Sequence, residues 1–298
     1  MAKNDVILFI PFGTFAFEQQ LATALYFAVR SDLKLHFLLI SRYDHKFASQ
    51  LDDAQIPYTI IDQSEDEEDA SASRVISNSP SSAKPGLWSL LRLPRWCQQL
   101  RFRKKKTKKL AQSLMPRCAL VSQERLLDFL PILKALRELN IPIILVPAGF
   151  DAWPGAPASI REDSYLLKAG LNDSVVPHGN RVAYFAVALL NRLVRRSMPS
   201  QVYETRSGTM LFYPAAHIFL LKLLGMLPRN PWYQGTTFAE YIMISGADEA
   251  AIYADGQIRP DKLLFFGSQP LDIIHELWSN REQLRHKLID EYDLEADK

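Results

Sequence analysis

The sequence has little of several features that define specialised classes of protein. It contains only 2 Cys among 298 residues, which excludes a disulfide-stabilised scaffold and predicts a reducing, cytoplasmic environment. Its 12 Gly and 18 Pro form no collagen-like or low-complexity repeat. No apolar run reaches the length of a membrane span, and the opening MAKNDVILFIPFG is too short and too soon interrupted for a signal peptide. The proportions of 48% hydrophobic and 23% charged residues are those of an ordinary globular protein.

The sequence also lacks the common short motifs for nucleotides, metals and hydrolysis. It has neither a Gly-rich dinucleotide motif nor a P-loop. No Cys pair or His-x-x-x-His has ligand spacing, and no acidic run has the glycine spacing of a Ca²⁺ loop, so no metal or cofactor is expected. Ser122 stands in Ser-Gln-Glu rather than in a Gly-x-Ser-x-Gly turn, which argues against a serine hydrolase.

Charge is distributed very unevenly along the chain, although the net charge is only +2. Residues 62–69 read DQSEDEED, and a Ser-rich stretch with few apolar residues follows, so a solvated loop is predicted over 62–86. No acidic residue occurs between Lys84 and Arg117, where basic residues are interleaved with Trp, Leu and Phe. A basic amphipathic insert is therefore predicted over 87–117.

Three interpretations of this basic insert are open: a solvated helix neutralised by the acidic run, an element that lies on a membrane surface, and a nucleic-acid contact. The rest of the chain has no excess of basic residues and resembles no nucleic-acid module, so no nucleic acid is expected. Indole rings favour the headgroup layer and Lys and Arg are attracted to anionic lipid, which favours the membrane surface. The residues expected there are Trp88, Arg92, Arg95, Trp96, Arg101, Arg103, Lys104, Lys105, Lys106, Lys108 and Lys109.

The hydrophobic pattern predicts an α/β fold with a Rossmann-like parallel sheet flanked by helices. Short apolar runs typical of buried strands alternate with stretches of helical periodicity. Between them, residues 151–234 are expected to form a helical insert with two apolar helices, Val182–Val194 and Ala215–Leu227, both too short to span a bilayer. The predicted strands are Val6–Pro11, Leu35–Ile40, Tyr58–Ile61, Cys118–Ser122, Ile143–Val146, Tyr241–Ser245 and Lys262–Phe266.

The last part of the chain resembles the end of the N-terminal domain of GT-B fold glycosyltransferases. The most similar groups are the capsule and cell-surface polysaccharide transferases and the related UDP-GlcNAc 2-epimerases. Their first domain closes with a strand, a helix, a second strand and a Gly-x-Pro-x-x-Asp turn, whereas here Gly267 to Asp272 is spaced Gly-x-x-Pro-x-Asp. The residues that carry the resemblance are Gly235, Phe238-Ala239-Glu240-Tyr241, Asp255-Gly256, Arg259 to Gly267, Pro270 and Asp272.

The resemblance implies that residues 1–298 form one Rossmann-like domain, the acceptor-binding half of a glycosyltransferase. In that family the nucleotide-sugar donor binds mainly in a second domain, so a second domain or a partner subunit is expected to supply it. The implied acceptor is a glycan or a lipid-linked sugar at the inner membrane surface. Two alternatives stay open: a non-catalytic adaptor that binds a partner through its apolar helices, and a fragment of a sugar-nucleotide epimerase.

Candidate site residues follow the predicted strands, because ligands of open parallel sheets bind beyond the carboxyl ends of the strands. Asp151 is a candidate general base, although an Asx turn is an alternative. His178, in Pro-His-Gly, titrates near neutrality, and the resemblance places it at the base position of some cell-surface polymer transferases. The substrate-binding candidates are Gly13, Thr14, Glu18, Gly149, Gly267 and Asp272.

Overall fold

The apolar run Val6–Ile10 forms the central strand β1, with every residue at most 7% exposed. The computed structural model of the chain describes residues 5–40, 45–61, 93–147, 181–205, 208–255, 257–266, 280–283 and 285–286. Six further strands join β1 in a sheet with the order β3-β2-β1-β4-β5-β8-β9. All neighbours in it are parallel. The other strands are β2 (Lys34–Leu39), β3 (Tyr58–Ile60), β4 (Cys118–Val121), β5 (Ile143–Leu145), β8 (Tyr241–Ile244) and β9 (Leu263–Phe265).

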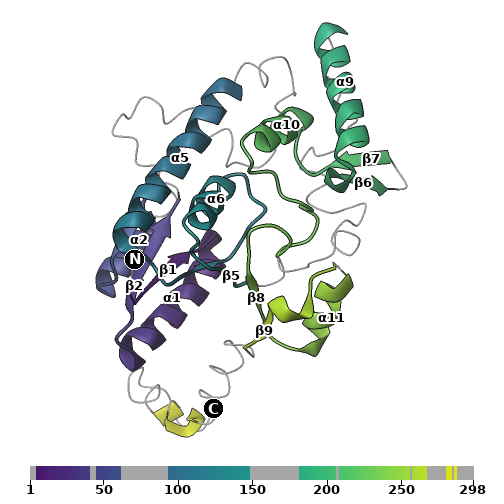
Figure 1. Cartoon of the computed structure of the whole chain (residues 1–298). Coiled ribbons are helices and arrows are strands. Elements are labelled where there is room, and N and C mark those ends of the chain that lie inside the picture. Colours follow the sequence, from purple (N-terminus) through teal and green to yellow (C-terminus); the bar gives the residue numbers. More distant parts are fainter. Residues whose placement is uncertain are drawn as a thin grey trace.

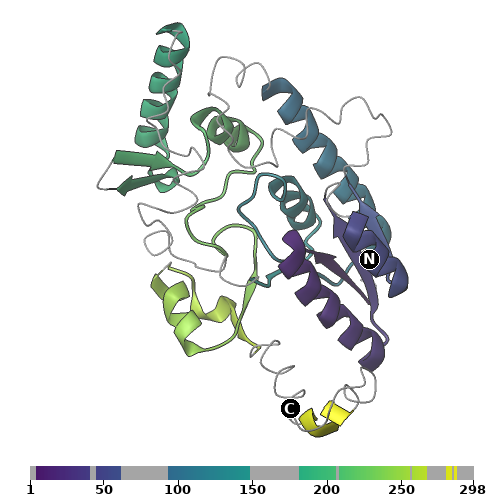
Figure 2. The same cartoon turned by 180° about the vertical axis from the view of Figure 1, so that it is seen from behind.

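Alternate residues of the strands supply two separate cores, because successive side chains point to opposite faces of a sheet. Ile7 and Phe9 pack beneath α1 (Gly13–Arg30) and α2 (His45–Asp53), where Phe17 stacks on Phe47 with ring centroids 4.1 Å apart. Leu8 and Ile10 face the opposite layer, which contains α5 (Leu93–Leu114) and α6 (Leu130–Glu138). Helices thus cover both faces of the sheet (Figure 1, Figure 2). The predicted Rossmann-like α/β fold is confirmed.

Helix α5, which lies in the region 87–117 of the expected basic insert, comes between β3 and β4 in the chain, and residues 87–92 lie outside the described residues. Its buried residues recur at helical spacing along one face, with Leu100 at 0% exposed and Thr107 at 1%. Trp96 lies on the same face at 5% exposure, and its ring centroid is 4.3 Å from that of His217. The indole is therefore buried in the core, and the prediction that it contacts a membrane surface is wrong.

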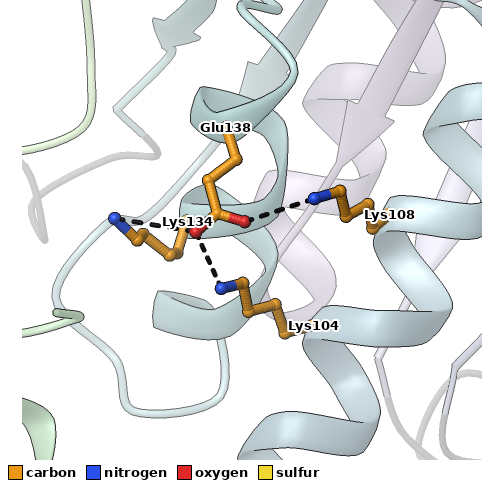
Figure 3. A network of polar contacts seen from close by, with 4 residues as sticks. All are labelled: Lys104, Lys108, Lys134 and Glu138. Atoms are coloured by element: carbon orange, nitrogen blue, oxygen red, sulfur yellow. Dashed lines mark hydrogen bonds and ion pairs between the residues drawn. The ribbon is translucent and has the colours of Figure 1, made fainter. Parts of the chain in front are cut away.

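Three lysines converge on one carboxylate where α5 packs against α6 (Figure 3). Lys104 Nζ donates a 2.7 Å hydrogen bond to Glu138 Oε1, and Lys108 and Lys134 lie 3.6 and 3.8 Å from the same carboxylate. The hydrogen bond from Lys104 lowers the pKa of Glu138, and the charges of the other two lysines act in the same direction. This network, together with an Arg103–Asp128 ion pair, joins the two helices.

The predicted helical insert contains two helices and an unpredicted antiparallel hairpin. The apolar stretches form α9 (Arg181–Ser197) and α10 (Ala215–Leu223). Between them, η4 (Pro199–Gln201) leads into β6 (Val202–Thr205) and β7 (Gly208–Leu211). Helix α9 stands out at the end of the molecule beside this hairpin (Figure 1). No helix in the described part of the chain is long and apolar enough to cross a membrane.

The last two strands extend the sheet beyond β5. A backbone hydrogen bond of 2.8 Å from Glu240 to Ile143 places the start of β8 beside β5, and α11 (Ala247–Asp255) follows it. The short helix η5 (Pro260–Lys262) then leads directly into β9. Segments far apart in sequence thus form one sheet.

Replacing Leu100 by Ala tests whether α5 belongs to the core. Because Leu100 is fully buried, the substitution is expected to lower the free energy of unfolding by about 2–5 kcal/mol. Gln98→Ala, at an exposed position of the same helix, is the matched control and should change it by less than about 0.5 kcal/mol. Urea titrations of both variants give the comparison. Equal stability of the two would contradict a core role for α5.

His217 predicts a pH-dependent loss of stability. Burial against Trp96 lowers the pKa of His217 to about 4, below its value of 6.5 in an unfolded chain. The unfolded chain therefore binds the proton more readily, so the contribution of this group is constant above about pH 6.5 and is lost as the pH falls toward 4. The expected loss across that window is about 3 kcal/mol. His217→Leu should flatten the unfolding profile in this range, whereas exposed His286→Gln should leave it unchanged.

Candidate functional site

The strand order creates a switch point between β1 and β4. From β1 the chain passes to β2 on one side, and it later returns to β4 on the other side. The loops that follow these two strands therefore diverge at the carboxyl edge of the sheet, where ligands bind in open parallel α/β folds. The residues after β1 and β4 consequently define the candidate site.

The start of α1 lies directly after β1 and carries no side-chain cap. Phe12 occupies the N-cap position in an extended conformation, and it makes no side-chain hydrogen bond to the first turn. Gly13 has φ of +75°, which a residue with Cβ adopts poorly, and nothing lies within 4 Å of where its Cβ would be. The first-turn N–H groups and the helix dipole therefore point a partial positive charge at this edge.

Ser122 follows β4 at the same switch point, and we missed it in the sequence. It is 4% exposed, and its Oγ has no hydrogen-bond partner among the described residues. Its N–H donates a 3.3 Å hydrogen bond to the Ile10 carbonyl, which places it beside the end of β1. Leu120 belongs to the core beneath α1, and strand alternation directs Ser122 to the same side. The sequence did indicate Ser122 as a candidate site residue, because it directly follows a buried strand. Gly13 was selected for nearly the same reason.

Glu124 is the most deeply buried charged residue after β4, at 1% exposure. Its Oε2 accepts hydrogen bonds from the N–H groups of Phe238 at 3.2 Å and Ala239 at 3.1 Å. The side chain of Gln123 closes the turn before it by accepting from the Glu124 N–H at 3.1 Å. Because its carboxylate accepts hydrogen bonds from backbone N–H groups, Glu124 holds the segment before β8 at the edge of the sheet. The buried side chain is not exposed to a substrate.

Cationic side chains hold the same segment from other directions. Lys262 Nζ donates to the Ala239 carbonyl at 3.0 Å, and Arg137 donates to the Thr237 carbonyl at 2.6 Å. Burial lowers the pKa of Lys262, and the nearby Glu124 charge opposes that shift. Backbone groups of the stretch before β8 are thus bonded to Glu124 after β4, to Arg137 of α6 and to Lys262 of η5.

Two buried phenols lie in the same region. The Tyr213 hydroxyl donates to the Arg125 carbonyl, whereas the Tyr253 hydroxyl has no hydrogen-bond partner among the described residues. Burial raises the pKa of both tyrosines. Both side chains therefore remain neutral hydrogen-bond donors at physiological pH.

The predicted substrate-binding residues separate into two groups. Gly13 and Thr14 lie in the first turn of α1 at the switch point, and exposed Glu18 lies one turn further along the same helix. These three residues therefore share one region of the carboxyl edge. The remaining candidates, His178, Asp151, Gly149, Gly267 and Asp272, lie outside the described residues, as do Trp88 and Arg92 of the basic segment.

The described acidic and thiol side chains form no evident metal site. No group of three or more His, Cys, Asp or Glu side chains among the described residues could hold a metal ion. Cys97 and Cys118 form no disulfide with each other.

No protein-family model matches the sequence, and no curated protein matches it. Among solved structures, UGT2 of Phytolacca americana complexed with UDP-2-fluoroglucose and pterostilbene is 13% identical with a TM-score of 0.41, over 88% of this chain and 54% of that one. LpCGTa in complex with UDP is 14% identical with a TM-score of 0.37, over 89% and 54%. MurG of Acinetobacter baumannii is 15% identical with a TM-score of 0.32, over 49% and 36%.

The chain therefore spans about half the length, or less, of these solved chains. At such TM-scores the likeness assigns no activity or ligand. The fold class rests on the order and direction of the strands themselves.

Gly235→Ala tests the tight turn that precedes β8. Gly235 has φ of +80°, and an added Cβ would overlap Ile242 Cδ1 and lie 2.9 Å from Ile242 Cγ1. Because Ile242 is fully buried, strain and overpacking should together lower the free energy of unfolding by about 2–4 kcal/mol. Gly246→Ala is the matched control, since nothing lies within 4 Å of its Cβ position. Denaturant titration should separate the two, and equal midpoints would contradict this packing.

Proposed function

We propose that the chain is the acceptor-binding half of a glycosyltransferase of GT-B type. It would receive a sugar from a nucleotide-sugar donor that is held by a second domain or a separate subunit. The acceptor would be a lipid-linked sugar or a surface polysaccharide. The seven-stranded parallel sheet and the closing motif around Gly235 and Lys262 support this proposal. A capsule-type or cell-surface transferase remains the preferred member of that class.

The observation that carries the proposal is the uncapped start of α1 at the switch point. Its free N–H groups and positive dipole suit an anionic group, such as the phosphate that links a sugar to a lipid. Gly13 leaves space for a close approach, and the hydroxyl of Ser122, which has no partner within the described ranges, lies at the neighbouring strand end. Asp151 or His178 would then act as the general base on the acceptor hydroxyl.

We place this reaction at the cytoplasmic surface of the inner membrane, where a lipid-linked acceptor is available. The protein would associate peripherally, through the basic helix α5, with anionic lipid. This location agrees with the charge of α5, whose basic residues are not balanced by acidic residues of the same helix.

A second candidate is a non-catalytic adaptor that binds a protein partner. It is favoured by exposed leucines on the two apolar helices: Leu189 is 59% exposed and Leu193 44% on α9, and Leu223 is 81% exposed on α10. An adaptor of this kind would need no ligand at the switch point. A substitution confined to the start of α1 therefore separates the two candidates.

Phe12→Asp is the decisive substitution. An Asp at the N-cap position stabilises a helix by about 0.5–2 kcal/mol, but its charge would repel an anionic substrate from the same N–H groups. We expect the transfer of labelled sugar from a panel of nucleotide sugars to lipid or polysaccharide, in membranes that contain the full chain and its partners, to fall at least about tenfold. The melting temperature should not decrease.

Phe12→Ser is the control, because it supplies a neutral cap and should preserve transfer within about threefold. Equal transfer by wild type, Phe12→Asp and Phe12→Ser would exclude an anion at this site. Absence of any transfer that depends on the chain, with every donor tested, would favour the adaptor.

A further inference from the structure

The basic residues of α5 fall into two sets on different sides of the helix. The inner set has partners within the protein: Arg103 pairs with Asp128, Lys104 and Lys108 pair with Glu138, and Lys106 donates to the Ile61 carbonyl at 3.0 Å. These cations stabilise the packing of α5 and are not available as a group for an external ligand. The prediction of a membrane-facing surface can therefore apply only to the basic residues of α5 outside this inner set.

The outer set consists of Arg95, Arg101, Lys105 and Lys109, which are exposed. None of them has a hydrogen bond or ion pair within the described part of the chain. At 3.6 residues per turn they fall within an arc of about 120°, and they extend over about 21 Å of the helix. The buried residues Trp96, Leu100, Thr107 and Ala111 lie on the opposite side.

One exposed aromatic residue lies within the same arc. Phe102 is 48% exposed, and Lys106 Nζ lies 5.0 Å from the centre of its ring. The outer face of α5 therefore combines four cations with an apolar ring on a straight, convex element. Figure 1 and Figure 2 show α5 along one side of the molecule.

We infer that the outer face of α5, formed by Arg95, Arg101, Lys105, Lys109 and Phe102, is the surface that lies against an anionic lipid bilayer. This inference rests on the location given in the proposed function. Four cations with no partner in the described part of the chain complement anionic headgroups, and an exposed Phe suits the boundary between headgroups and acyl chains. A nucleic acid is disfavoured because the rest of the sequence has no excess of basic residues and resembles no nucleic-acid module.

Flotation of the full chain with vesicles tests the inference. The outer-face variant carries Arg95→Gln, Arg101→Gln, Lys105→Gln and Lys109→Gln. The matched control carries Lys34→Gln, Arg196→Gln, Lys222→Gln and Arg229→Gln, which removes the same charge from exposed positions on other elements. The vesicles are phosphatidylcholine alone, or phosphatidylcholine mixed with phosphatidylglycerol.

Wild type and control should bind the mixed vesicles, and should bind much less at high salt because the charges are screened. The outer-face variant should lose about six hundredfold in partitioning, since each of its four cations contributes about fivefold. Circular dichroism should show all three proteins equally folded, because the substituted residues are exposed. Phe102→Ser should lower binding several-fold without changing its salt dependence.

If the outer-face variant and the control lose vesicle binding equally, the loss depends on net charge alone, and the inference is overturned. No binding by wild type, with binding gained when the six acidic residues of 62–69 are neutralised, would identify the chain's own acidic run as the occupant and overturn it as well. Tighter binding to RNA than to mixed vesicles would overturn it in favour of a nucleic acid. If the vesicle results are as expected but the wild-type chain supports no sugar transfer, the proposed function is refuted and the assignment of the lipid-facing surface stands.

Discussion

The buried carboxylate of Glu124 is the contact on which the rest of the sheet edge depends. It follows β4, near the middle of the sheet, and accepts hydrogen bonds from two backbone N–H groups that immediately precede β8. Those donors come from a segment more than 100 residues further along the chain, so the contact joins the early and late strands. Without it, two buried N–H groups would lose their acceptor, at a cost of about 1–3 kcal/mol each. The turn at Gly235 and the Lys262 hydrogen bond are arranged around the same segment.

The sheet could be predicted from the sequence because its strands are buried on both faces. Continuous apolar runs such as Val6–Ile10 have no other stable position in a parallel α/β fold, and the structure has every predicted strand within about two residues of its predicted bounds. The hairpin of β6 and β7 was missed because its short strands show little apolar alternation. Glu124 was missed because its role depends on which segment lies beside it, and one sequence carries no direct signal of that kind. Ser122 could have been selected, since it directly follows a buried strand.

Helix α5 shows why composition alone misleads about a charged segment. Its sequence is strongly basic, yet one face is core, with Leu100 and Trp96 buried, and the adjoining lysines hold α6 through Glu138. Helical periodicity separates these roles, but the partners of each cation come from other elements and are seen only in the fold. The outer face of α5 therefore carries fewer positive charges than the whole basic segment, and these charges belong to identified residues. A crossover helix in this position can stabilise the sheet and present a surface at the same time.

The coupling of β4 to β8 through Glu124 is tested most directly by amide hydrogen exchange of wild type, Glu124→Ala and Glu240→Ala. Glu240 is an exposed residue of the same segment and serves as the control. We expect Glu124→Ala to increase exchange at Phe238, Ala239 and the first residues of β8, with protection of β1 and β2 retained. Glu240→Ala should match wild type. Unchanged protection before β8 in Glu124→Ala would contradict the account.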